Sequence, residues 1–495
     1  MAIHSNLKRD WLSNPKNEFL AGLVVALALI PEAIGFSIIA GVDPRVGLYA
    51  SFSIAVIISL IGGRPGMISA ATAAVAVLVV PLVRNHGVEY LFAATILMGI
   101  FQCIAALLRL DLLMRFVSTS VISGFVNALA ILIFMAQLPM LTGENFTVTT
   151  YAMVAAGLAI IYGLPRITKA VPAPLVAIIL IAAISVYYKM DVTTVGDTGK
   201  LPDSLPWFHI PQIPVTWETL RIIAPYSLAM AAVGLLESLL TASIVDDMTE
   251  TRSDKKRETY GQGIANFVTG FIGGMGGCAM IGQSVINIKS GGRRRLSTFV
   301  AGVMLLVLIV ALGDWVAQIP MPALVAVMIF VSISTFRWQS FTEITHHPWP
   351  SNIVMLATVV MVVATHDLSI GVLTGVLLSG IFFAWKVRQL VTIDTAAEGR
   401  TQRYIFGGQI FFGSVDMMYD AMEFNEDGID TIIIDVHDAH FWDISATGML
   451  DKITQRFQAE GKTVEIIGLN EASADIVDKY GEHEEPFRNF STIGH

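Results

Sequence analysis

The chain has 495 residues, of which 54% are hydrophobic and only 14% charged, and its formal net charge is −9. Soluble domains carry about 25% charged residues, so this composition predicts a polytopic membrane protein and argues against nucleic-acid binding. Cys103 and Cys278 both lie in apolar segments and predict neither a disulfide framework nor a metal cluster. The polar start, 1–19, predicts no cleavable signal peptide.

The apolar stretches predict fourteen membrane segments, so both ends of the chain are expected on one side of the membrane. Several segments are shorter than the ~20 residues that a full helical span requires. In chain order they are 19–40, 46–62, 67–83, 90–108, 117–140, 150–164, 171–188, 221–245, 260–275, 278–288, 297–312, 321–335, 352–366 and 369–385.

The third and tenth segments, 67–83 and 278–288, are short and interrupted by small residues. They hold the same place in each half of seven, which is typical of a transporter built from inverted repeats with its site at the breaks. The alternative is a pair of ordinary kinked helices whose small residues serve packing.

Lysine and arginine predict the orientation. With the N-terminus inside, nineteen of these cations fall in cytoplasmic segments and five outside. This is the positive-inside bias of a protein of the inner (plasma) membrane with both termini in the cytoplasm. The five outside are Arg45, Arg84, Lys189, Lys200 and Arg221.

From about Val391 the composition changes to that of a soluble domain. Strands are expected at 404–412, 431–436 and 464–468, and helices at 414–424, 445–460 and 471–481. Alternating strands and helices predict a small α/β domain. It follows the last membrane segment directly and is therefore expected in the cytoplasm.

The two interrupted segments predict an anion site. The stretches 67–76 and 276–287 each begin with small residues and then become helical. A helix N-terminus carries about half a positive charge and binds anions through its free N–H groups. Neither stretch contains Lys or Arg, so backbone amides are expected to hold the anion, helped by Ser69, Thr72, Gln283 and Ser284.

Glu237 lies in the middle of a long apolar run, 228–244. A carboxylate at the bilayer centre costs several kcal/mol, so such a residue normally faces a polar cavity and binds or relays something. Thr241 is one helical turn further on the same face. A proton or cation at Glu237 would remove its repulsion of the anion, which predicts symport of H⁺ or Na⁺. The alternative is a structural carboxyl.

The first segment contains a second acid, Glu32, after Pro31. It is expected in the outer half of the membrane, either in the site or in an interfacial role. Phe36 is one turn on and either lines a pocket or packs against neighbouring helices.

Four motifs together resemble the sulfate-permease (SulP) family of anion transporters, which includes the solute-carrier 26 proteins. They are Val42–Ser51 with Gly62–Gly66; Glu237–Thr241 with Asp246–Thr249; Asn287–Arg293 with Leu296–Ser297; and, for a STAS domain, Phe441–Ala446 with Ile467–Asn470. They occur in the family's order over nearly the whole chain.

The resemblance implies a polytopic α-helical protein whose fourteen membrane helices form a 7+7 inverted repeat of core and gate domains. It implies a homodimer, and an anion between half-helices three and ten. The expected boundaries are 1–390 for the membrane domain, with repeats at 1–188 and 221–390, and 397–495 for the STAS domain. The predicted substrate-binding residues are Glu32, Phe36, Ser69, Ala71, Thr72, Ala73, Cys278, Ala279, Met280, Ile281 and Gln283.

The coupling site also follows from the resemblance. Glu237, Thr241 and Thr72 match cation-ligand positions of sodium-coupled members, but those members carry Asp where this chain has Glu. Glu is similar to proton-coupled members and favours H⁺. Further departures are Ala70-Ala71 for Gly-Pro, Gln283 for Arg, and Glu32 for Gln, which leave the substrate open.

The sequence therefore predicts a secondary active transporter of a sulfate-like, bicarbonate or dicarboxylate anion, without a cofactor and not an enzyme. The alternatives are an uncoupled channel or exchanger, a Na⁺-coupled bicarbonate symporter, a nucleobase carrier, and a regulatory protein. In the STAS domain, Ser445 matches a phosphorylation site of anti-sigma antagonists. It is expected to be a helix N-cap or a regulatory residue that a cytoplasmic partner recognises.

Overall fold

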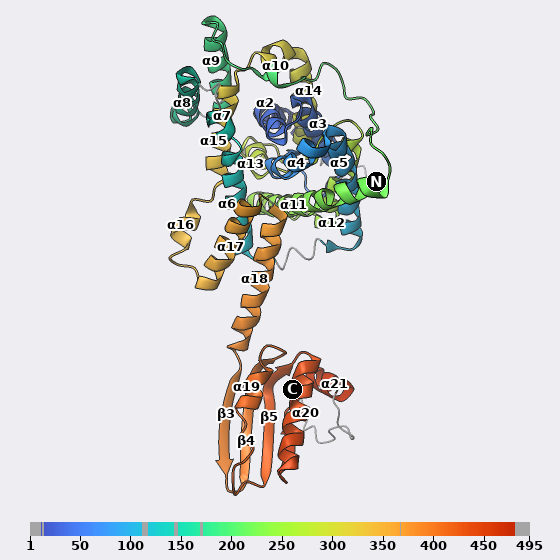
Figure 1. The fold of residues 1–495 in the computed structure, drawn as a ribbon, viewed down its shortest axis with the longest axis vertical. Helices are drawn as coiled ribbons and strands as arrows, with labels where there is room; N and C mark the ends of the chain where they lie inside the picture. Colours follow the sequence, from blue (N-terminus) through green and yellow to red (C-terminus); the bar gives the residue numbers. More distant parts are fainter. Residues whose placement is uncertain are drawn as a thin grey trace. The chain divides into compact units, whose positions relative to one another are not determined.

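The computed structural model describes residues 11, 14–110, 117–142, 147–168, 172–366 and 368–480. The chain forms two compact units, Met1–Val376 and Leu377–His495 (Figure 1). Four of the cations that predict the orientation, Lys8, Arg9, Arg115 and Lys169, lie outside the described residues, as does 481–495 of the predicted C-terminal domain.

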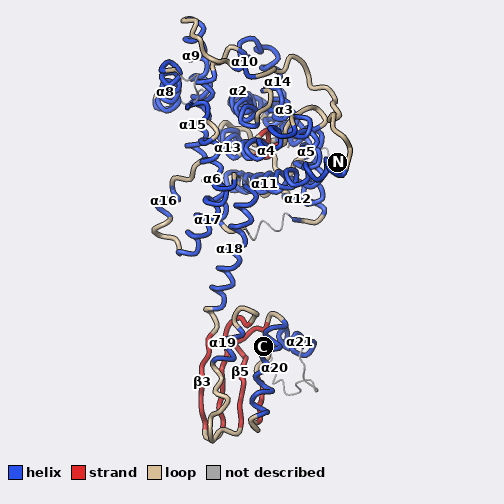
Figure 2. Tube along the Cα trace, in the orientation of Figure 1, coloured by secondary structure: helices blue, strands red, loops and turns tan. Residues whose placement is uncertain are grey.

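The first unit is almost entirely helical (Figure 2). Each of the fourteen predicted segments contains a helix, and within the described residues nine helices are long and apolar enough to cross a membrane. The number of crossings stays a prediction, because several other helices are short. The helices are α2 (Pro15–Ala40), α3 (Pro44–Ile61), α4 (Ala73–His86), α5 (Val88–Leu107), α6 (Thr119–Met135), α7 (Leu138–Thr142), α8 (Val148–Gly163), α9 (Ala173–Tyr187), α10 (Val195–Thr198), α11 (Trp217–Thr249), α12 (Lys255–Gly270), α13 (Ile281–Lys289), α14 (Arg295–Ala317), α15 (Met321–Thr335), α16 (Gln339–Glu343), α17 (Trp349–Thr365) and α18 (Leu368–Arg388), which continues into the second unit.

Two groups of helices pack within the first unit. α5 packs on α12 and α14 packs on α2 and α3, whereas α17 packs on α6 and α15 packs on α8. Small residues allow close approach: a Cβ atom on Gly99 of α5 would lie 2.4 Å from the backbone nitrogen of Phe267 on α12. Close backbone contact of this kind holds membrane helices together, because lipid supplies no hydrophobic force between them.

Two of the predicted segments are interrupted. In the third, strand β1 (Ser69–Ala71) precedes α4; in the tenth, strand β2 (Gly277–Ala279) precedes α13. The two strands pair antiparallel, with Ala70 opposite Cys278. The prediction that two broken helices meet is therefore confirmed. Both helices belong to the group that contains α2 and α11.

The second unit is a small α/β domain, as predicted. Its four strands have the order β3-β4-β5-β6; β3 is antiparallel to β4, and β4, β5 and β6 are parallel. The elements are β3 (Thr392–Glu398), β4 (Thr401–Ile410), α19 (Val415–Asp420), β5 (Thr431–Phe441), α20 (Ile444–Ala459), β6 (Thr463–Ile467) and α21 (Glu471–Tyr480).

The sequence predicts three of these strands and misses β3. Its residues, Thr392–Glu398, are exposed along almost the whole strand. An edge strand that buries nothing shows no alternation of apolar and polar residues, which is the signal for a half-buried strand. Pairing with β4 alone holds it in the sheet.

The core of the second unit lies between the sheet and α20. Tyr404 and Phe406 of β4 are buried, and the ring of Tyr404 packs against Phe457 of α20. The Tyr404 hydroxyl accepts a hydrogen bond from the backbone N–H of Glu423 at 3.0 Å. Burial raises the pKa of Tyr404 above its ordinary value, because the ionised hydroxyl would lose its contact with water.

Asp443, not Ser445, caps the N-terminus of α20. The Asp443 carboxylate accepts hydrogen bonds from the backbone N–H groups of Ala446 at 2.9 Å and Phe412 at 2.8 Å. Ser445 is exposed in the first turn. The expectation that Ser445 is the N-cap is therefore wrong. Asp443 itself was the overlooked signal, because Asp caps as well as Ser does.

An Asp443→Ala variant is expected to loosen the start of α20, whereas Ser445→Ala is not. Loss of an N-cap costs about 1 kcal/mol, with a range of roughly 0.5–2, and 1–2 kcal/mol corresponds to about 5–30-fold in an opening equilibrium. Hydrogen exchange of the full-length protein should show that the first-turn amides of α20 exchange about 5–30-fold faster in Asp443→Ala and at the wild-type rate in Ser445→Ala. Equal exchange in the two variants would contradict the assignment of the cap.

Candidate functional site

The β1–β2 pair brings the starts of two helices together inside the first unit. Ser69 pairs with Ala279 and Ala71 with Gly277, and every residue of both strands is buried. α4 begins two residues after Ala71, and α13 two residues after Ala279. Because the strands run in opposite directions, the two helices leave the pair in opposite directions.

Buried serine hydroxyls accept hydrogen bonds from backbone N–H groups along the outer edges of this two-stranded sheet. The backbone N–H groups of Ala71 and Ala279 donate to the hydroxyls of Ser51, at 3.3 Å, and Ser238, at 3.0 Å. The N–H of Ile68 donates to Ser284 Oγ at 3.0 Å. Unpaired backbone groups are not tolerated in an apolar interior, so these hydroxyls make the interruption possible.

Asn266 of α12 acts as a substitute strand partner for Gly277. Its Oδ1 accepts the Gly277 N–H at 2.9 Å, and its Nδ2 donates to the Gly277 carbonyl at 3.0 Å and to Gln102 Oε1 at 2.9 Å. All three side-chain contacts are buried. Asn266 therefore fixes the start of β2, and through β2 the start of α13.

A buried polar face of α12 continues this support. Glu258, Gln262 and Asn266 lie at four-residue intervals and are each fully buried. Gln262 Nε2 donates to Ser69 Oγ at 2.8 Å and to Glu258 Oε1 at 2.9 Å. This polar face is not among the features predicted from the sequence, although three polar residues spaced by four in an apolar region indicate it.

Replacing Asn266 by Ala is expected to destabilise the first unit strongly. The change leaves both backbone groups of Gly277 and the Gln102 amide oxygen without partners, and each buried unsatisfied group costs about 1–3 kcal/mol. Thermal unfolding in detergent should show a large fall in the unfolding temperature, and uptake of the anion should be lost as well. The matched control is Gln318→Ala, whose exposed side chain donates to the Asp314 carbonyl; an equal effect of the two changes would contradict this role.

The two helix starts lack side-chain caps. Thr72, in an extended conformation, is the N-cap residue of α4, and Met280 holds the same place in α13; neither side chain bonds the first turn. First-turn N–H groups have no partner within their own helix. Two uncapped N-termini therefore begin next to a buried β pair, an arrangement that suits an anion.

The β1–β2 pair and the starts of α4 and α13 are together called the crossing below. Glu237 lies beside this crossing. Its Oε2 is 3.0 Å from the Sγ of Cys278, and the same sulfur is 3.1 Å from Thr72 Oγ1. Glu237 of α11, Cys278 of β2 and the N-cap of α4 thus form one chain of contacts. The hydroxyl of Thr241 donates to the Glu237 carbonyl oxygen at 2.7 Å and not to its carboxylate.

Glu32 approaches the crossing from α2. Its Oε1 accepts a hydrogen bond from Gln283 Nε2, in the first turn of α13, at 2.9 Å. Both acids that the sequence predicts for the site therefore contact the tenth segment. Glu237 contacts Cys278, before α13 begins, and Glu32 contacts Gln283, within α13. The Gln283 Oε1 atom is buried and has no partner within the described residues, so it is left to a ligand or water.

The remaining predicted site residues fall into two sets. The hydroxyl of Ser69 accepts from Gln262, and that of Ser284 bonds Ile68, so both belong to the scaffold of the β pair. Of the others, Ala71, Ala73, Cys278, Ala279 and Met280 belong to the β pair or the helix starts and are buried, whereas Ile281 is partly exposed. Phe36 is buried on α2, which packs against α4 and α13. Next to Ile281, Gly282 is exposed, and a Cβ there would meet nothing within 4 Å.

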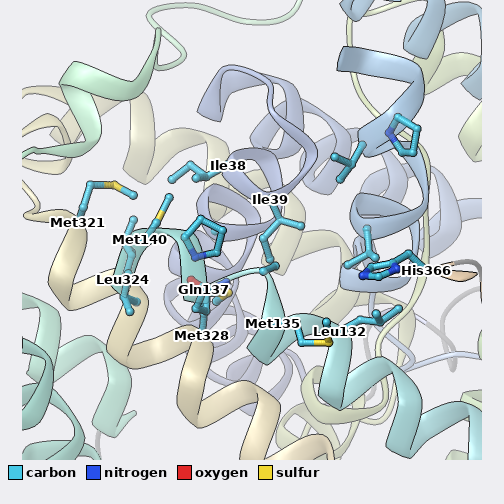
Figure 3. A pocket seen from close by; sticks show the side chains of 17 residues that line it. Ile38, Ile39, Leu132, Met135, Gln137, Met140, Met321, Leu324, Met328 and His366 are labelled. Carbon is cyan, nitrogen blue, oxygen red and sulfur yellow. The ribbon is translucent and has the colours of Figure 1, made fainter. Parts of the chain in front are cut away.

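An apolar cavity of about 480 Å³ lies beyond the crossing, between α2 and α4 on one side and α6 and α15 on the other. Figure 3 shows side chains of these helices around it, among them Ile39, Leu132, Met321 and Met328, with His366 at one edge. None of the predicted site residues lines it. Its nearest links to them are Gly35, beside Phe36, and Val77, one turn after Ala73.

Comparisons with known proteins agree with this architecture. Residues 16–166 and 144–358 match the sulfate permease family, and 393–494 match the STAS domain. YbaR of Bacillus subtilis (strain 168), named as a candidate sulfate transporter, is 57% identical over 95% of this chain and 98% of its own. The bicarbonate transporter BicA of Picosynechococcus sp. (strain ATCC 27264 / PCC 7002 / PR-6) is 24% identical over 92% of this chain and 89% of its own.

Solved structures agree in fold. The transmembrane domain of a cyanobacterial BicA aligns with a TM-score of 0.66 at 25% identity, over 74% of this chain and 98% of that one. The murine Solute Carrier 26 family member A9 aligns with a TM-score of 0.81 at 15% identity, over 95% of this chain and 87% of that one. The relatives are transporters and not enzymes. The chain is a multi-pass membrane protein that belongs to the sulfate permease family of anion transporters and ends in a STAS domain.

Proposed function

We propose that this protein is a secondary active symporter that carries a small oxyanion together with a proton. The observation that carries the proposal is the meeting of two uncapped helix N-termini, those of α4 and α13, at the buried β1–β2 pair. An anion held there replaces the missing caps. Sulfate and bicarbonate, the substrates named for YbaR and BicA, and dicarboxylates all present oxygens that accept hydrogen bonds from backbone amides.

The proton site in this proposal is Glu237. Its carboxyl oxygen and the α4 N-cap share one neighbour, the Cys278 thiol, so its charge lies close to the anion. A bound proton removes the repulsion, and linkage requires that the anion in turn favour proton binding. Na⁺ is less suited, because hard cations take oxygen ligands, whereas the contact of this carboxylate is sulfur.

Transport by alternating access would use the two helix groups. The group with α2, α4 and α13 is the proposed core, and the group with α6 and α15 is the proposed gate. The apolar cavity between them is the path between the crossing and one face of the membrane. We further propose the inner (plasma) membrane, cytoplasmic termini, a homodimer, and a STAS domain that receives a cytoplasmic regulator, with Ser445 exposed for modification.

The test is uptake into proteoliposomes of radiolabelled sulfate, bicarbonate and succinate in parallel, under an imposed H⁺ gradient, Na⁺ gradient or neither. The proposal expects one of these anions to accumulate under the H⁺ gradient alone. Accumulation that requires Na⁺ would overturn the proton assignment. Flux that is equal under all three conditions would identify a channel or exchanger instead.

A further inference from the structure

The second unit exposes a patch of large apolar side chains at one end of its sheet. The patch consists of Leu390, Phe412, Trp442 and Ile444, which are 61%, 67%, 55% and 62% exposed. We call it the tip patch. Scattered exposed apolar residues are common on soluble domains, but a contiguous group marks an interaction surface.

Phe412 and Trp442 belong to two loops that are tied together, and Ile444 begins α20 directly after the second loop. The backbone N–H of Phe412 donates to the Asp443 carboxylate at 2.8 Å, and that of Trp442 donates to the Ile410 carbonyl at 3.0 Å. The ring of Phe411 contacts both neighbouring aromatics, with centroids 5.2 Å from Phe412 and 6.4 Å from Trp442. The patch is therefore a fixed surface and not a set of independent side chains.

The topology of the sheet determines which way this end faces. α18 ends at Arg388, and β3 begins four residues later; within that interval Val391 N–H bonds the Arg388 carbonyl and the Val391 side chain is buried. The connection is therefore short and fixed. Figure 1 shows β3 starting at the end of α18 and running away from it.

β4 then runs back toward α18. Thr392, the first residue of β3, pairs with Gly407, and β4 continues to Ile410, about 10 Å of strand past that level. β5 is parallel to β4, and its last residue, Phe441, pairs with Ile410. The loops after β4 and β5, which carry the tip patch, therefore project to the side from which α18 arrives.

α18 is an apolar helix of membrane-spanning length, with only 11% of its apolar window buried and with Lys386 and Arg388 in its last turn. Such cations mark the level of the lipid headgroups. Leu390 is two residues beyond Arg388, so the tip patch lies at the end of the second unit that directly follows the cations of α18. Trp and other apolar side chains at that depth are stabilised by burial at the boundary between headgroups and acyl chains.

We propose that the tip patch inserts into the bilayer surface, so that the STAS domain is anchored to the lipid at a second point besides α18. The occupant is the phospholipid surface of the leaflet at which α18 ends. The proposal holds whichever side of the membrane that is, and it does not depend on the transported anion.

The test uses the full-length protein in phosphatidylcholine/phosphatidylglycerol nanodiscs, with p-benzoylphenylalanine replacing Phe412, Trp442 or Ile444 in turn. All three side chains are exposed, so folding should be retained. Because three positions are tested, the result does not depend on any single variant folding correctly. The matched control is the same replacement of Gln458, which is also exposed. It lies fourteen residues further along α20, about 21 Å from Ile444. After illumination, mass spectrometry separates lipid adducts from protein adducts.

The expected result is a lipid-adduct yield at the tip positions roughly tenfold above that at Gln458, as for side chains that lie in the interface. Two results would overturn the proposal. One is adducts at the tip positions to protein only, which would mean that another part of this chain or a second copy covers the patch. The other is lipid adducts no more frequent at the tip positions than at Gln458.

Discussion

A Glu237→Gln variant is expected to lose proton-driven accumulation of the anion while still exchanging it across the membrane. Glutamine has the shape of a protonated glutamate, so the contact with Cys278 Sγ, 3.0 Å in the wild type, can persist. The glutamine side chain cannot bind and release a proton, so the H⁺ gradient no longer drives the transport cycle. One pH unit corresponds to about 1.4 kcal/mol per proton.

For electroneutral one-proton symport of a monovalent anion, the wild type should therefore accumulate substrate about tenfold per pH unit, and the variant should equilibrate at a ratio of about 1. The measurement is radiolabelled uptake with and without a pH gradient, together with counterflow under symmetric pH. Glu218→Gln is the matched control, since Glu218 is an exposed acid in the first turn of the same helix. Accumulation by Glu237→Gln equal to that of the control would return Glu237 to a structural role.

A Gly277→Ala variant is expected to abolish transport by disrupting the β1–β2 pair. A Cβ atom at this position would lie 2.1 Å from the Ala70 carbonyl oxygen and 2.7 Å from Ile54 Cδ1. The Ala70 oxygen belongs to the paired backbone, so it cannot move away without breaking the register of Ala71 with Gly277. Overpacking of this kind costs about 1–3 kcal/mol and shifts the start of α13.

The measurements are uptake and thermal unfolding, each compared with Gly380→Ala. Gly380 lies in α18, where an added Cβ would meet nothing within 4 Å, so this variant should behave as the wild type. Wild-type uptake by Gly277→Ala would mean that the geometry of the crossing does not determine transport.

The sequence predicts the helices and the crossing because these features depend on local composition. Long apolar runs specify membrane helices without reference to the rest of the fold, and small residues at 67–76 and 276–287 reveal where two of them break. The inward acids, Glu32 and Glu237, stand out because charge is rare in such runs. Both acids contact the β2–α13 segment.

The parts that the sequence does not predict depend on partners far along the chain. Ser69 and Ser284 look like free hydroxyls beside an anion, but Gln262 and Ile68 bond them. Asn266 pairs with Gly277 only because α12 packs behind the crossing. Nothing local to such residues distinguishes a ligand from a support, since both require a buried polar group.

The most direct test of the anion site is anomalous diffraction from crystals of the protein grown with selenate or with bromide. We expect a selenium or bromine peak between the starts of α4 and α13, placed so that the selenate oxygens lie within about 3 Å of the first-turn backbone nitrogens of these helices. A peak for neither anion at this place, or a peak only beside lysine or arginine side chains, would contradict the claim that the two helix N-termini hold the transported anion.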